Sequence, residues 1–121
     1  MIGRLHHVIL DCPEPRLLAE FYGELLDKPI THDDGDFVVV SDDARTSGLA
    51  FQRSYDHVAP TWPEPSTPQQ VHFDVMVEDP VEAGLRVVAM GATHLREDVY
   101  ADPAGHPFCL ILRPKWAPPI K

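Results

Sequence analysis

Two stretches of the chain alternate apolar and polar residues in the same way, and a helical pattern follows each. The first stretch runs from Leu5 to Pro15 and the second from Gln70 to Pro80, with a histidine near the start and prolines near the end of each. Alternation with a period of two predicts a strand, and proline is tolerated in the first turn of a helix. The chain is therefore predicted to contain two similar modules, each with a strand that leads into a helix.

Apolar residues at three- and four-residue steps predict the two helices. The first spans about Pro13 to Leu26. The second begins at Asp79, where a capping-box pattern ends in Glu82, and it stops at Gly91. We expect an apolar stripe on each helix to cover a sheet: Leu17, Leu18, Phe21, Tyr22 and Leu25 on the first, and Val81, Leu85, Val88 and Ala89 on the second.

Short β-rich segments follow each helix, and turns rich in Asp and Gly at 33–36 and 102–106 predict hairpins. The segments expected to form strands are Ile30–His32, Phe37–Val40, Leu49–Arg53, His94–Tyr100 and Pro107–Leu112. With 44% apolar residues, the chain has enough material for one compact core. We predict one domain over residues 1–121: a first module at about 1–56, a proline-rich linker at 57–70, a second module at about 71–113 and a tail at 114–121.

The net charge of −9 argues against a nucleic-acid partner, because a phosphate backbone is bound by a basic surface. No apolar run approaches the roughly 20 residues that span a bilayer, so we expect no membrane partner. No secretory leader precedes the first predicted strand, and the two cysteines are too few for a disulfide framework. These features predict a cytoplasmic protein with reduced thiols.

Alternation also sorts the side chains of each strand between two faces. One face of the predicted strands is apolar and is expected to contact the helices. The other face collects five polar side chains, with hardly any Lys, Glu or Arg in the central parts of the strands. This composition favours a concave surface that holds a small organic ligand over a solvated outer face. The five are His7, Gln52, His72, Asp74 and Cys109.

Three features together resemble the vicinal oxygen chelate superfamily: the histidine at the head of each module, Phe21-Tyr22 late in the first helix, and the segment 100–106 before the last strand. The resemblance covers nearly the whole chain. Members of this superfamily include glyoxalase I, extradiol dioxygenases and bleomycin resistance proteins. The resemblance implies an α+β fold of paired βαβββ modules, with helices outside two curved sheets and a ligand cavity between them. It also implies closure of the cavity by a two-fold partner, so we expect a homodimer.

In that superfamily each module supplies two ligands to a divalent metal, one from its first strand and one from its last. The matching positions here are His7 and Gln52, then His72 and Cys109. The metal enzymes usually carry glutamate at the last-strand positions, so this chain departs from the pattern at both carboxylates. Two histidines and a thiolate suit zinc, with Gln52 or water as the fourth ligand. The alternative, an inert buried Cys109 and no metal, is favoured because cysteine is among the most commonly buried residues and behaves as a small apolar side chain.

Two functions fit this reading. The first is a glyoxalase-like protein that binds a small organic molecule and acts as a lyase or isomerase, with Asp74 or His72 moving a proton. The second is a sequestering protein of the bleomycin-resistance kind, which binds a cationic drug without chemistry. Asp74 as a loop anchor and a thiolate–imidazole pair of Cys109 with His72 remain open. The other histidines are expected at the surface or in turns: His6, His32, His57, His94 and His106.

Overall fold

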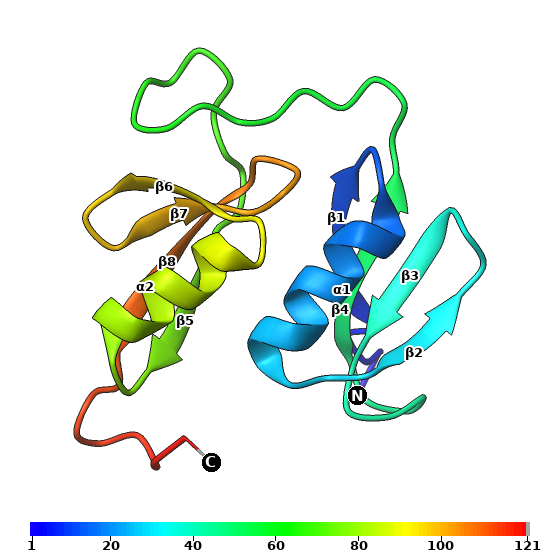
Figure 1. Cartoon of the computed structure of the whole chain (residues 1–121). Helices are drawn as coiled ribbons and strands as arrows, with labels where there is room; N and C mark the ends of the chain where they lie inside the picture. Colours follow the sequence, from blue (N-terminus) through cyan, green and yellow to red (C-terminus); the bar gives the residue numbers. More distant parts are fainter. Residues whose placement is uncertain (121) are drawn as a thin grey trace. The chain divides into compact units, whose positions relative to one another are not determined.

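The computed structural model describes residues 1–120 and contains two compact units, Met1–His57 and Val58–Lys121 (Figure 1). Each unit consists of a strand, a helix and three further strands, in that order. The prediction of an α+β fold built from two βαβββ modules is confirmed. The predicted tail ends at Lys121, which lies outside the described residues.

The first unit forms a four-stranded sheet in the order β1-β4-β3-β2. Strands β1 and β4 are parallel, and the other neighbours are antiparallel. The turn predicted at 33–36 joins β2 to β3, with Gly35 at a φ of 92°. The elements of this unit are β1 (His7–Cys12), α1 (Pro15–Leu26), β2 (Ile30–Asp33), β3 (Phe37–Val40) and β4 (Gly48–Arg53).

Helix α1 covers one face of this sheet with most of its predicted stripe. Leu18, Phe21 and Tyr22 are buried, and the Tyr22 ring stacks on Phe51 of β4 with 5.5 Å between centroids. Leu17 is 55% exposed, so this member of the predicted stripe lies outside the core. Aromatic burial of this kind accounts for a large share of a small core.

The second unit repeats this arrangement in the order β5-β8-β7-β6, with β5 and β8 parallel. Its elements are β5 (Phe73–Val77), α2 (Pro80–Ala89), β6 (Thr93–Arg96), β7 (Val99–Ala101) and β8 (Pro107–Leu112). The prediction of a single strand over His94–Tyr100 was wrong, because β6 and β7 form a hairpin there. The chain reverses at Glu97 and Asp98, and the φ of 51° at Glu97 is one that glycine or asparagine usually adopts, so a single aspartate was the turn signal in the sequence.

Both ends of α2 follow the prediction. The Asp79 carboxylate accepts hydrogen bonds from the backbone N–H groups of Val81 and Glu82, at 3.1 and 3.2 Å. Gly91 follows the helix with a φ of 114°, which a residue with a Cβ rarely adopts. The cap predicted at Asp79 is confirmed.

The apolar stripe predicted on α2 does not cover the sheet. Val81, Leu85 and Val88 are exposed, whereas Gly84 and Val87 are the buried residues of this helix. Tyr100 of β7 explains the difference, because its hydroxyl extends to α2 at a position where only glycine leaves room. The helix therefore packs against the sheet with the side that carries Gly84, and Val81, Leu85 and Val88 lie outside this helix–sheet interface. No helix within residues 1–120 is long and apolar enough to cross a bilayer.

Candidate functional site

Each sheet has one face in contact with its helix, and in the second sheet the opposite face is open, because Asp74 and Met76 on it are exposed. In the second unit Tyr100 and Phe108 are in register and belong to the helix face, where Tyr100 meets Gly84. Asp74 and Cys109 are in register on neighbouring strands and point to the open face, because each lies one residue from a position of the helix face.

Three predicted site residues come together on the open face of the second sheet. Asp74 of β5 stands beside Cys109 of β8, and His72 immediately precedes β5. The His72 Nε2 lies 3.7 Å from Asp74 Oδ1, an ion-pair distance that is longer than a hydrogen bond. Both side chains are half exposed, so a ligand can reach them.

The Cys109 thiol keeps its proton at neutral pH. Burial raises the pKa of Cys109 above its ordinary value, and the charges of Asp74 and Asp98 raise it further. A hydrogen bond from the thiol to Asp74 acts in the same direction. The group that contacts Asp74 is therefore a neutral thiol that donates to a carboxylate, which does not favour a thiolate–imidazole pair of Cys109 with His72.

His7 is oriented by the backbone of the neighbouring strand. The Gly48 N–H donates to His7 Nδ1 at 3.1 Å, so the neutral ring carries its proton on Nε2. Partial burial, followed by the charges of His6 and His32, lowers the pKa of His7. At neutral pH this side chain presents an N–H donor to its surroundings.

Gln52 lies away from His7 along the same sheet. In the β1–β4 ladder His7 is in register with Gly48, and Gln52 is in register with Asp11. Four positions separate them, which is about 13 Å of strand. The third residue of β4 is Ala50, whereas the third residue of β8 is Cys109. The two units therefore place Gln52 and Cys109 at different points of their ladders.

The donors within each sheet do not fit a divalent metal as they are arranged. A metal would have to displace the proton on His7 Nε2 and the thiol proton that Cys109 shares with Asp74. Neither Gln52 nor Cys109 supplies the carboxylate that a proton-shuttling metal site needs. Within either unit of residues 1–120, no group of three His, Cys, Asp or Glu side chains is placed to hold one ion. The metal-ligand assignment stays a prediction.

A second histidine–carboxylate pair stabilises the turn before β8. His106 Nδ1 lies 2.8 Å from Asp102 Oδ2, and the Asp102 side chain is fully buried. Asp102 Oδ1 also accepts from the backbone N–H groups of Ala104 and His106. His106 was expected as a turn histidine, and it is one. The spacing Asp-x-x-x-His across a Pro- and Gly-containing turn was the signal from which the pairing could have been found.

His32 lies on the same face of the first sheet as His7, which the alternation pattern did not predict. It is in register with Val39 on β3, and its charge contributes to the lowered pKa of His7. Alternation along the short strand β2 was the available signal, but a register shift between Ile30 and His32 obscures it.

A family model described as a glyoxalase-like domain matches residues 7–111. No curated protein matches the sequence. A glyoxalase-related enzyme from Fulvimarina pelagi is 21% identical, with a TM-score of 0.67 over 96% of this chain and 92% of that one. A glyoxalase/bleomycin resistance protein/dioxygenase family enzyme from Burkholderia phytofirmans PsJN is 12% identical, with a TM-score of 0.67 over 89% and 97%. Oxidase ChaP-H2 is 19% identical, with a TM-score of 0.63 over 97% and 98%.

At these identities the solved structures show a shared fold, and the family model covers most of the sequence. The order strand, helix and three strands occurs twice within the matched residues. The features that resembled the vicinal oxygen chelate superfamily, from the histidines that begin each module to the turn at 102–106, lie within that match as well. The chain therefore belongs to the glyoxalase-like domain family of the vicinal oxygen chelate superfamily.

Proposed function

We propose that this protein binds a small organic molecule on the open face of its second sheet and moves a proton on it, as an isomerase or lyase. The observation that carries the proposal is the cluster of His72, Asp74 and Cys109. A histidine beside a carboxylate is a common acid–base unit in enzymes. Because the fold hosts many activities, the proposal depends on this cluster and not on the family.

The three side chains have distinct roles in this proposal. His72 takes a proton from a carbon next to a carbonyl group and returns it to a neighbouring carbon or to a leaving group. The Asp74 carboxylate, 3.7 Å away, stabilises the imidazolium that forms. Cys109 donates its S–H to Asp74 and so holds the carboxylate in place. Met76 and Ile111, which are in register two positions further along, supply apolar contacts.

Deuterium exchange tests this activity directly. The parent protein is incubated in D₂O with chelator and a panel of α-hydroxyketones and α-ketoaldehydes, and loss of the α-proton is followed by NMR. We expect exchange of at least one compound and a loss of about 100-fold or more in His72→Gln. Asp74→Asn should lower the rate less, and His57→Gln serves as the control. Absence of exchange with every compound, or full activity of His72→Gln, would contradict the proposal.

A second candidate function is sequestration of a cationic molecule, and a hollow in the first unit favours it. This hollow of about 450 Å³ is lined by Asp34, Asp36, Phe37, Gln52, Arg53 and Tyr55. The Tyr55 ring already has a cation beside it, the Arg53 guanidinium at 5.9 Å from the ring centroid, and an organic cation would take that place next to the carboxylates. A hydrogen bond from the Phe37 backbone N–H is the main cause that lowers the pKa of Asp34, so this carboxylate stays anionic.

Calorimetry with bleomycin, followed by mass spectrometry of the recovered drug, separates the two functions. A sequestering protein binds the drug and returns it intact, and Tyr55→Leu weakens binding. If Tyr55→Leu binds bleomycin as tightly as the parent, the drug binds elsewhere. If the parent shows no heat of binding with bleomycin, the sequestration function is wrong.

The predicted homodimer remains a proposal. Strand β6 lies at the edge of the second sheet with all four residues exposed, and exposed edges favour pairing or cover by a partner. Isologous dimers are the most common assembly. Light scattering at micromolar concentration should give twice the 13.5 kDa of the chain, and a monomer mass would overturn the proposal.

A further inference from the structure

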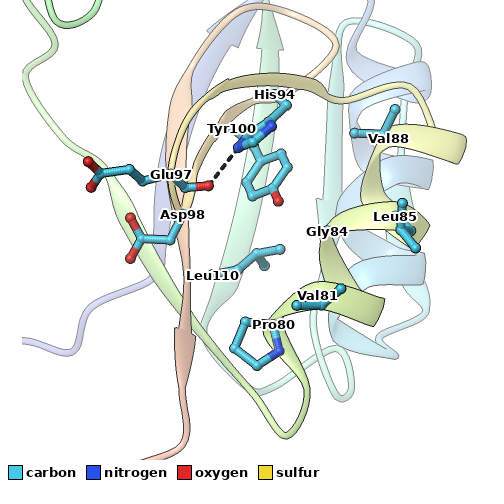
Figure 2. A pocket seen from close by; sticks show the side chains of 10 residues that line it. All are labelled: Pro80, Val81, Gly84, Leu85, Val88, His94, Glu97, Asp98, Tyr100 and Leu110. Atoms are coloured by element: carbon cyan, nitrogen blue, oxygen red, sulfur yellow. Dashed lines mark hydrogen bonds between the residues drawn. The ribbon is translucent and has the colours of Figure 1, made fainter.

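A trough of about 380 Å³ lies in the second unit between α2 and the β6–β7 hairpin (Figure 2). The lining is mostly apolar. Val81, Leu85 and Val88 of α2 form one side, and Leu110 of β8 is buried within it. Leu110 and Cys109 are adjacent on β8 and point to opposite faces. The trough is therefore on the helix face, away from the cluster of His72, Asp74 and Cys109.

The polar group of the trough is the Tyr100 hydroxyl. Tyr100 is only 7% exposed, and its ring stacks between His94 and Phe108 at 4.5 and 6.0 Å between centroids. The hydroxyl reaches past the ring toward Gly84, as Figure 2 shows. No residue within 1–120 forms a hydrogen bond with it. Although the ring is buried, the hydroxyl oxygen is open to the trough, so it is available to form a hydrogen bond with a ligand there.

The walls around this hydroxyl are already in position. His94 Nε2 is 2.6 Å from the Glu97 carbonyl oxygen, a contact that holds the ring against Tyr100. A Cβ at position 84 would overlap the Tyr100 hydroxyl, so glycine is what allows the hydroxyl to lie there. A preformed site of this kind loses little entropy when it binds a ligand.

The chemistry of the lining selects the ligand. The volume falls within the usual range for small-molecule sites, which are mostly apolar with few polar groups. The carboxylates of Glu97 and Asp98 lie at the rim and point away from the trough (Figure 2), where their charge still disfavours an anion. We propose that this trough binds a neutral, flat organic molecule with one hydrogen-bonding oxygen, of the phenol class. Its oxygen pairs with the Tyr100 hydroxyl and its ring lies on Leu85 and Val88.

Fluorine NMR with two matched probes tests the role of the hydroxyl. The parent protein is titrated with 4-fluorophenol and with fluorobenzene, which lacks the oxygen. We expect 4-fluorophenol to bind more tightly, and Tyr100→Phe to weaken it by about three- to tenfold while fluorobenzene is unaffected. Tyr100→Phe keeps the ring stacked, so the core stays packed. Equal binding of 4-fluorophenol to the parent and to Tyr100→Phe would overturn the proposal.

A matched pair of tryptophan variants tests the location. Leu85→Trp fills the trough, whereas Arg86→Trp places the same side chain on an exposed neighbouring position that does not line it. We expect Leu85→Trp to abolish binding of both probes and Arg86→Trp to bind them like the parent. His72→Gln should bind 4-fluorophenol normally, which separates this inference from the proposed proton transfer.

Three outcomes would overturn the inference. The first is that 4-fluorophenol at several millimolar does not bind to the parent protein. The second is that Leu85→Trp binds the probes as well as the parent does. The third is that the parent is a dimer that does not bind the probes and that Leu85→Trp is a monomer. The last result would assign this face to a second copy of the chain.

Discussion

Helices α1 and α2 belong to equivalent modules but contact their sheets in different ways. Helix α1 contributes large side chains to its interface, with Tyr22 and Phe21 buried against the first sheet. Helix α2 contributes Gly84 and Val87, and its larger apolar residues lie beside the interface. In the second unit a trough lies beside this interface.

The difference follows from which element supplies the aromatic ring. Val40 of β3 and Tyr100 of β7 hold equivalent positions, each in register with the second residue of the last strand. The first unit has a small valine at this position, and its helix supplies the ring, with Tyr22 stacked on Phe51 of β4. In the second unit Tyr100 supplies the ring from the strand and requires a glycine on the helix. A repeated topology can therefore place the aromatic ring on the helix in one copy and on the strand in the other.

Truncation of the buried ring should have the largest effect. Tyr22→Ala is expected to lower the free energy of unfolding by about 3–5 kcal/mol, because it leaves a cavity under α1. Leu85→Ala on α2 should change it by no more than about 0.5 kcal/mol, because Leu85 is 71% exposed. Urea denaturation measures both. Similar losses for the two variants would mean that the helices are packed alike.

The contact between Gly84 and Tyr100 predicts a coupled pair. Gly84→Ala should cost about 1–3 kcal/mol through overpacking against the hydroxyl. Adding Tyr100→Phe removes the overlapping oxygen and should recover at least half of that loss, measured as a coupling energy in a double-mutant cycle.

Gly23 of α1 provides the matched control for this cycle. A Cβ there would lie 2.9 Å from the Lys28 carbonyl oxygen, which is backbone and cannot be removed by substitution. Gly23→Ala should therefore be destabilising with or without Tyr100→Phe. Independent, additive effects of Gly84→Ala and Tyr100→Phe would contradict the steric account of α2.

The helix starts differ as well. Asp79→Ala should cost about 1 kcal/mol, because it removes two hydrogen bonds from the first turn of α2. Glu14, at the same position before α1, makes no capping hydrogen bond. Glu14→Ala should change stability by no more than about 0.5 kcal/mol. Thermal unfolding of the two variants measures both effects. An unchanged unfolding midpoint for Asp79→Ala would show that the Asp79 side chain does not stabilise α2.

The smallest predicted effect concerns Cys109, whose counterpart in the first unit is Ala50. In a Cys12→Ser background, alkylation of Cys109 should be slow near neutral pH and still accelerate at high pH, because its pKa is raised. Asp74→Asn removes a charge and a strong acceptor, which lowers that pKa and should speed alkylation about two- to fivefold at pH 8. An unchanged pH–rate profile would exclude the thiol–carboxylate contact.

Much of the local structure could be predicted from the sequence, because short-range chemistry determines it. The strand beginning at His7, the cap at Asp79 and the turn at 102–106 follow from alternation, hydrogen bonding to nearby backbone, and proline and glycine geometry. Alternation also placed Asp74 and Cys109 on one face. The hairpin at Glu97 was missed because a single aspartate was its turn signal in the sequence.

Only the tertiary structure decided which of these residues meet. The alternation of apolar and polar residues assigns each side chain to a face of the sheet, but it does not give the pairing of neighbouring strands. That pairing places Asp74 beside Cys109 and separates His7 from Gln52. Likewise, an apolar stripe shows that a helix is amphipathic, but a distant side chain selects the side that is buried. For α2 that side chain is Tyr100, which admits only Gly84 and leaves Leu85 at the edge of a trough.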